Sequence, residues 1–227
     1  MNSSTTELCI LLDASSSMGP IHHAAIDATN NFLEEQKQAS GRGHVSLVTF
    51  HSHVKTVHNR IPLDEMLPLT PGDYRLEGGT ALYDALGHQI EKTLKHMEAT
   101  SPDDPQSKVI FLIVTDGWER GSRNWSSSDV RALIKKCRKL GWTFLFLGAG
   151  QDLMPMAAKL GIHRANLLPF QATNEGIQNS LTHVSRTILS LREMDMESPT
   201  PPKTFFWRFF GTFRQNSSTK EDDDKEH

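Results

Sequence analysis

The chain has 227 residues, 37% of them hydrophobic, and a formal net charge of −3 at pH 7. This length suits one domain with a tail, and the balanced charge gives no basic field of the kind that attracts nucleic acid. The start of the chain carries no apolar leader core, and no apolar run is long enough to span a bilayer. We therefore expect a cytoplasmic protein that is not membrane-attached. Cys9 and Cys137, both in apolar contexts, predict free thiols, as expected in a reducing compartment.

Short apolar strands alternate with amphipathic helices along the chain. In order, the predicted elements are strand 7–12, helix 21–38, strands 44–50 and 55–63, helix 80–97, strand 109–114, helix 128–140, strand 143–148, helix 153–160, strand 165–170 and helix 174–196. The two consecutive strands are joined by the short turn at Ser52 and His53, which favours a hairpin. This order predicts a doubly wound α/β fold with helices on both faces of a mostly parallel sheet.

The composition changes after residue 198, which predicts a domain over residues 1–198 and a tail over residues 199–227. A proline-rich break opens the tail, and an acidic run occupies residues 221–224. Between them lies an aromatic cluster that includes Phe205, Phe206, Trp207, Phe209 and Phe210. So many aromatic side chains do not suit a solvated linker. We expect them either to pack on their own domain or to dock a partner, and we rank membrane binding third.

Hard oxygen donors follow the first strand directly. Asp13, Ser15 and Ser17 come at its carboxyl end, the edge where ligands of open parallel sheets bind. Carboxylate and hydroxyl oxygens suit Mg²⁺, and also Mn²⁺ or Ca²⁺, better than Zn²⁺. Taken alone, the same residues could simply form a turn that caps the next helix.

Two further segments carry matching donors. Gly78 and Gly79 precede Thr80, which is predicted to open a helix, and Asp116 follows the strand 109–114. If the strands that carry Asp13 and Asp116 are neighbours, their carboxylates face one pocket. Two such carboxylates repel each other unless a cation or protons compensate. The sequence therefore predicts a divalent metal site.

The combination of DxSxS, a loop threonine and a strand-ending aspartate resembles the von Willebrand factor A-type (VWA) domain and its metal-ion-dependent adhesion site (MIDAS). All five positions match, namely Asp13, Ser15, Ser17, Thr80 and Asp116. The resemblance implies a six-stranded sheet with the third strand antiparallel at one edge and the strands of Asp13 and Asp116 side by side. It also implies that an acidic residue of a protein partner fills an open position on the metal. The motifs are most similar to those of stand-alone bacterial or phage members.

Several residues near the motif leave alternatives open. Asp84 could orient Thr80 or be a charge on the helix surface. Trp118 and Arg120 could anchor a partner, or Trp118 could cover the end of the sheet. His51 and His53 alternate across a hairpin turn with no acidic or thiol partner in the sequence, so we do not expect zinc there.

The motif is compatible with three functions. The favoured one is a metal-dependent protein-binding module and not an enzyme. The alternative is a Mg²⁺-dependent phosphohydrolase with Asp13 as nucleophile, but Ser15 stands where such an enzyme needs a carboxylic general acid. A scaffold with a vestigial metal site is the third, and the intact five-residue set argues against it.

Overall fold

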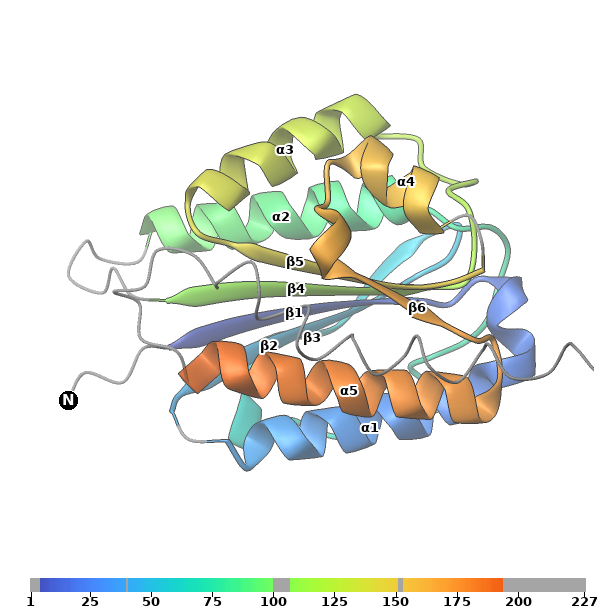
Figure 1. The fold of residues 1–227 in the computed structure, drawn as a ribbon, viewed down its shortest axis with the longest axis horizontal. Helices are drawn as coiled ribbons and strands as arrows, with labels where there is room; N and C mark the ends of the chain where they lie inside the picture. The colour runs from blue at the N-terminus through green and yellow to red at the C-terminus, as the bar shows by residue number, and fades with distance from the viewer. Residues whose placement is uncertain (1–4, 40, 100–106, 151–152, 194–227) are drawn as a thin grey trace, which may run out of the picture.

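The computed structural model describes residues 5–39, 41–99, 107–150 and 153–193 (Figure 1). Its strands are β1 (Thr6–Asp13), β2 (Gly43–Phe50), β3 (Val54–Pro62), β4 (Lys108–Thr115), β5 (Thr143–Ala149) and β6 (Leu167–Phe170). Its α-helices are α1 (His22–Lys37), α2 (Leu82–Ala99), α3 (Ser127–Lys139), α4 (Leu153–Leu160) and α5 (Asn174–Glu193). The short 3₁₀ helices are η1 (Ser16–Ile21), η2 (Leu63–Glu65) and η3 (Arg164–Asn166).

One six-stranded sheet with the order β3-β2-β1-β4-β5-β6 forms the centre of the fold. Every neighbouring pair is parallel except β2 and β3, which form an antiparallel hairpin at the edge. The expected doubly wound α/β fold is confirmed. The register pairs Leu12 of β1 with Thr49 of β2 and with Val114 of β4, so β1 and β4 end at the same height.

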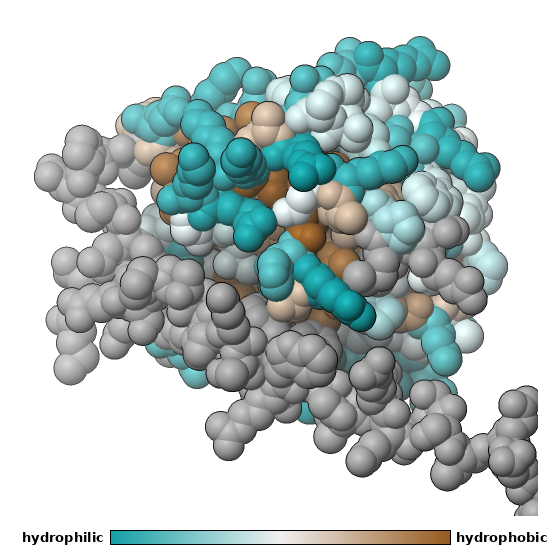
Figure 2. All heavy atoms as spheres, turned by 45° about the horizontal axis from the view of Figure 1, so that its top comes forward, coloured by the Kyte–Doolittle hydropathy of each residue, from teal (hydrophilic) through white to brown (hydrophobic). Residues whose placement is uncertain are grey.

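Helices cover both faces of the sheet, with α2, α3 and α4 on one side and α1 and α5 on the other (Figure 1). The alternation of side chains along β1 divides the core accordingly. Leu8 and Ile10 point into the layer under α1 and α5, while Cys9 and Leu11 point into the layer under α2 and α3. Both Cys9 and Cys137 are buried free thiols. Figure 2 shows that many side chains on this face are hydrophilic, with hydrophobic side chains gathered near its middle.

Some boundaries differ from the prediction. Thr80 does not open a helix, because α2 begins at Leu82 and leaves Thr80 in the preceding loop. The predicted helix 21–38 is confirmed as α1, and the 3₁₀ helix η1, which was not predicted, precedes it. Pro20 lies inside η1, and its ring disfavours a continuous α-helix through this point.

The predicted domain boundary at residue 198 and the aromatic tail lie outside the described residues. Within the part of the chain that is described, no helix is both long and apolar enough to cross a membrane.

The central strand β4 supplies a direct test of the packing. The Phe111 ring is fully buried, and it stacks on Trp142 and Phe144 with ring-centroid distances of 5.8 and 5.0 Å. Phe111→Ala is expected to lower the free energy of unfolding by about 3–5 kcal/mol, because it removes this burial and leaves a cavity. Chemical denaturation measures the loss. Leu140→Ala is the control, since Leu140 is 59% exposed, and equal losses in the two variants would contradict this packing.

Candidate metal centre

The five predicted donors come from three segments that meet at the carboxyl ends of β1 and β4, at the right of Figure 1. The chain leaves β1 toward α1 on one face of the sheet, whereas the connection after β4 leads to α3 on the other face. Adjacent strands whose connections diverge in this way leave a crevice between them, the usual ligand position in open α/β sheets. The topology therefore creates the site.

Asp13 forms the floor of this crevice and is fully buried. Its Oδ1 accepts a hydrogen bond from the Ser15 backbone N–H at 2.8 Å, and its Oδ2 accepts one from the Thr115 hydroxyl at 2.5 Å. Its backbone carbonyl accepts a further bond from the Tyr74 hydroxyl at 2.5 Å. Both carboxylate oxygens are thus held in fixed positions.

A chain of hydroxyl groups leads from the floor to the rim. The Ser15 and Ser17 hydroxyl oxygens are 3.0 Å apart, and the Ser17 hydroxyl donates to Asp116 Oδ1 at 2.6 Å. Ser15 is buried, whereas Ser17 is exposed and Asp116 is half-buried. The crevice is therefore open to solvent on the side of Ser17 and Asp116.

Backbone hydrogen bonds bring Thr80 to the same crevice. The N–H of Glu77 donates to the Ala14 carbonyl at 3.0 Å, and the N–H of Arg120 donates to the Thr80 carbonyl at 2.9 Å. Gly117 lies against two of the hydroxyls: a Cβ placed there would lie 3.4 Å from Thr80 Oγ1 and 3.5 Å from Ser17 Oγ. All five predicted residues are therefore brought together.

The two carboxylates are held in an environment that disfavours their charge. The pKa of Asp13 is raised to about 6, mainly by burial and also by the nearby charge of Asp116, against the hydrogen bonds from Thr115 and Ser15. Burial also raises the pKa of Asp116. The pKa of Tyr74 is raised by burial first and then by the charge of Asp13. A cation in the crevice would relieve this repulsion.

The donor set fits a hard divalent cation. It offers three hydroxyls and two carboxylates, and no nitrogen or sulfur. The described residues contain no group of three or more His, Cys, Asp or Glu side chains that could hold a metal, which agrees with a site built mainly on hydroxyls. Mg²⁺ takes oxygen ligands of this kind and retains several waters. That these five residues bind the ion stays a prediction.

Sequence reasoning missed two residues that position Asp13. Thr115 precedes Asp116 at the end of β4, and its polar side chain in an otherwise apolar run was an available signal. Tyr74 lies in the long loop before Thr80, and no pattern in the sequence marks it. Its ring stacks on His22 at 5.2 Å, and a ring nitrogen of His22 lies 2.8 Å from the Tyr74 carbonyl oxygen. His22 thus packs locally beside the site.

Asp84 has a role that neither sequence hypothesis described. Its carboxylate accepts four hydrogen bonds from the loop after β4, three of them from the backbone N–H groups of Arg123, Asn124 and Trp125. Glu119 accepts four more, from Tyr83, Gly121 and Ser122. These two carboxylates fasten the loop after β4 to the start of α2, and so fix Asp116 relative to Thr80.

The remaining candidates lie around the rim. Trp118 is partly buried against the core layer under α2 and α3, and the Lys159 ammonium lies 5.6 Å from its ring centroid. This position favours the hypothesis that Trp118 covers the end of the sheet. Arg120 is exposed beside the Thr80 loop.

The fold and this crevice define a VWA-type domain, and comparison with known proteins agrees. A family model described as "VWA domain containing CoxE-like protein" matches residues 2–145. The chain therefore belongs to this VWA family. A search of curated proteins found no match.

Solved structures with the same fold include two VWA-type proteins. Proximal thread matrix protein 1 from the mussel byssus has a TM-score of 0.59 at 17% identity, with 82% of this chain and 48% of that chain covered. A second structure of that protein (TM-score 0.57, 14% identity, 82% and 46% covered) has a zinc-occupied MIDAS motif. A von Willebrand factor type A protein from Catenulispora acidiphila has a TM-score of 0.56 at 16% identity, with 81% and 42% covered. The match thus covers less than half the length of each.

Burial of Asp13 predicts an unusual pH dependence of the metal-free protein. The folded protein keeps the Asp13 proton up to about pH 6, whereas an unperturbed aspartate releases it near 3.8. The unfolded state therefore binds fewer protons in this window, and the free energy of unfolding falls as the pH rises through it, by up to about 3 kcal/mol. In the presence of a chelator, Asp13→Asn is expected to gain stability over the wild type as the pH rises from about 4 to about 7.

The asparagine can keep the local hydrogen bonds, because the Thr115 hydroxyl can accept from its amide and donate to the Gly117 carbonyl, which lies 3.3 Å away. Chemical denaturation at several pH values measures the difference. Added Mg²⁺ should reverse the order, stabilising the wild type alone. If the free energy of unfolding changes with pH in the same way in the two proteins, the pKa of Asp13 is not raised by burial.

Proposed function

We propose that this chain is a divalent-metal-dependent protein-binding module, in which the metal held by Asp13, Ser15, Ser17, Thr80 and Asp116 coordinates an acidic residue of a protein partner. The observation that carries the proposal is the open crevice in which these oxygens converge. Its floor is buried and fixed by Tyr74 and Thr115, and its rim at Ser17 and Asp116 faces solvent. An external ligand would therefore reach the site from the exposed rim.

Mg²⁺ is the ion that we propose for the cell. The mussel protein has a MIDAS motif that holds zinc, which supports a divalent site here but does not select the ion. The donors in this chain are all hard oxygens, three of them neutral. Hard oxygen donors suit Mg²⁺, Mn²⁺ or Ca²⁺, whereas zinc prefers sites with nitrogen or sulfur ligands.

The roles that we propose for the five residues follow from the chemistry of their side chains. The Ser15, Ser17 and Thr80 hydroxyls provide neutral ligands, and Asp13 fixes the backbone of Ser15 and the Thr115 side chain behind them. A metal with few direct carboxylate ligands stays electrophilic, and so attracts a carboxylate of the partner at its open position.

The structural details argue against the phosphohydrolase alternative. A nucleophilic aspartate needs an oxygen free to attack, yet Asp13 is fully buried with a hydrogen bond on each carboxylate oxygen. Ser15 supplies no general acid at neutral pH. We therefore propose a binding module and no hydrolytic turnover.

Metal binding is testable with a pair of neighbouring serines. Ser17→Ala removes a hydroxyl that bonds Asp116, and it should weaken Mn²⁺ binding about tenfold or more in calorimetric titration. Ser16→Ala is the matched control, because Ser16 is exposed and its backbone N–H, which the change leaves in place, donates to the Gly78 carbonyl. Asp13→Ala should abolish binding while the fold persists. If the Ser16 and Ser17 variants bind Mn²⁺ with equal affinity, Ser17 does not contribute to the metal site.

Carboxylate recognition needs its own experiment. A fluorescent peptide with one glutamate flanked by glycine and serine should bind the full chain in Mg²⁺, and chelation should release it. The same peptide with glutamine in place of glutamate should bind at least about tenfold more weakly, because it lacks the charge that the metal attracts. Thr80→Ala should weaken the glutamate peptide only. Binding that survives both chelation and Thr80→Ala would place recognition elsewhere.

A further inference from the structure

One stretch of the chain concentrates positive charge. Residues 130–174 contain seven lysines and arginines and a single acidic residue, Asp152, which lies outside the described residues. Seven cations against one carboxylate give this stretch a net charge of +6, although the whole chain has a net charge of −3. The near-neutral total therefore conceals a local excess, and local charge is what a binding partner meets.

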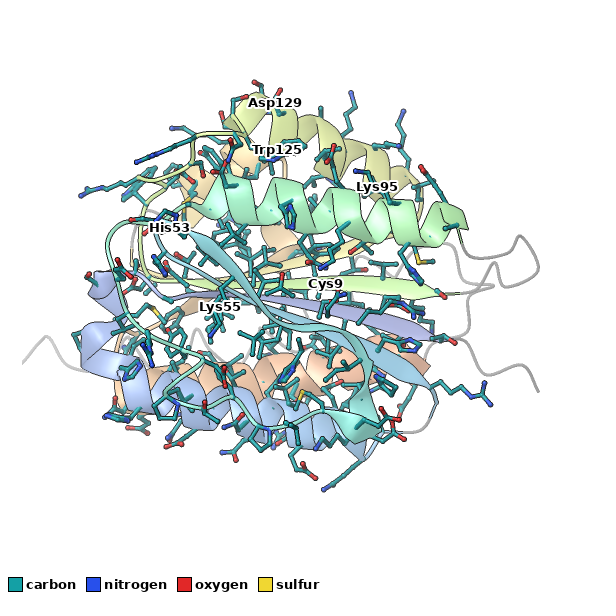
Figure 3. The ribbon with its side chains drawn as sticks, turned by 180° about the vertical axis from the view of Figure 1, so that it is seen from behind. Cys9, His53, Lys55, Lys95, Trp125 and Asp129 are labelled. Carbon is teal, nitrogen blue, oxygen red and sulfur yellow. The ribbon has the colours of Figure 1, made fainter. Side chains whose placement is uncertain are left out.

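Four of these cations share one exposed side of α3, here named the basic surface. They are Arg131, Lys135, Arg138 and Lys139. Figure 3 shows Asp129 at the start of α3, at the outer edge of the molecule. Gly161, directly after α4, lies against the basic surface: Arg138 Nη1 donates to its carbonyl at 2.9 Å, and a Cβ placed on it would lie 3.5 Å from Arg131 Cγ.

The neighbouring elements add cations of the same sign. α4 lies beside α3 on the same side of the sheet (Figure 1). Lys159 and Arg164, two residues before and three residues after Gly161, are both exposed. The Lys159 ammonium lies near the Trp118 ring, 5.6 Å from its centroid. The positive charge thus extends from α3 to α4 and η3.

The cations of the basic surface have no carboxylate partner in the described part of the chain. None of the four takes part in an ion pair there. Lys136 differs, because its ammonium lies 3.9 Å from Glu98 of α2. Asp129 is engaged by the cap of its own helix, where it accepts a hydrogen bond from the Ser126 backbone N–H at 3.0 Å. The charge of the basic surface is therefore available to a ligand.

A solvated helix face usually mixes both signs of charge, whereas this side of α3 repeats one. Lys135 is four residues from both Arg131 and Lys139, so cations stand on adjacent turns, an arrangement that destabilises a helix. The helix dipole compensates for Lys136, Arg138 and Lys139 in the last turn. It does not compensate for Arg131, which lies two turns earlier. An anionic ligand would relieve this repulsion.

The side chains around the basic surface suit a protein ligand. Leu140, directly after Lys139, is 59% exposed, and a protein partner can bury such a side chain among charged contacts. The described residues of α3, α4 and η3 include no Phe, Tyr or Trp. Proteins that bind single-stranded nucleic acid usually stack its bases on such rings. Protein is therefore favoured over nucleic acid.

From this charge distribution we propose that the basic surface docks an acidic segment of a protein partner. Carboxylates of that segment lie opposite Arg131, Lys135 and Arg138, which span about 10 Å of α3 at 1.5 Å per residue. The inference goes beyond the proposed function, because none of the five candidate metal ligands lies on α3, α4 or η3. Complementary charge of this kind selects a partner and speeds its association.

A fluorescent octaglutamate peptide tests the surface on the full chain, with a chelator present so that no metal contributes. The peptide should bind at low ionic strength and lose affinity as salt is added. Lys135→Glu should weaken binding about tenfold or more, because it reverses the central charge. That variant should stay folded, since a glutamate four residues from both Arg131 and Lys139 forms favourable pairs.

A matched pair of arginines supplies the control. Arg131→Glu should also weaken octaglutamate binding about tenfold. Arg186→Glu makes the same reversal at an exposed residue of α5, on the other face of the sheet (Figure 1), and should leave the affinity unchanged. Equal affinities for these two variants would overturn the basic surface. The metal-dependent function would be unaffected by that result, because the assay contains no metal.

Other occupants of the basic surface have their own signatures. Displacement of octaglutamate by oligothymidylate at lower concentrations than by unlabelled octaglutamate would overturn the assignment to protein in favour of nucleic acid. Co-sedimentation with phosphatidylserine vesicles that Lys135→Glu abolishes, without any peptide binding, would overturn it in favour of a lipid surface. A tenfold gain in octaglutamate binding after replacement of the acidic run at residues 221–224 by Gln and Asn would make the chain's own run the occupant.

Discussion

The structure of the site depends on one constraint, the burial of the Asp13 carboxylate between β1 and β4. Placing an acidic side chain at the end of a fully buried strand is unfavourable, and this burial raises the pKa of Asp13. Two groups offset it, the Ser15 N–H and the Thr115 hydroxyl, and the Tyr74 hydroxyl holds the backbone carbonyl of the same residue. These bonds fix the strand end, the loop before Thr80 and the end of β4 in one arrangement. A cation bound in the crevice would compensate the negative charge of the carboxylates.

A second pair of carboxylates organises the surroundings. Glu119 and Asp84 accept hydrogen bonds from backbone N–H groups of the loop between β4 and α3 and of the start of α2. Both carboxylates keep their negative charge, but their oxygens are occupied by backbone N–H groups. The bond from the Trp125 N–H to Asp84 also holds the Trp125 ring against Gly87 of α2.

The comparisons support the fold more strongly than they support a particular function. The solved relatives share 13–17% identity with this chain, and at this level a common fold carries many functions. The functional argument rests instead on the site: hydroxyls outnumber carboxylates, and the candidate nucleophile is buried. These features suit the recognition of a carboxylate ligand better than the hydrolysis of a phosphoester.

The sequence by itself determined the α/β alternation, because the spacing of apolar residues that marks a strand or a helix lies within that element. It also predicted the five candidate metal ligands, because they belong to short motifs at strand ends. Which strands are neighbours came from the family resemblance, and the pairing of β1 with β4 agrees with it. Tertiary structure alone decided the roles of Tyr74, Asp84 and Trp125. Their partners lie 61, 39–41 and 38 positions away in the chain, and no local pattern records contacts between loops. Such contacts form only when the sheet has brought the loops together.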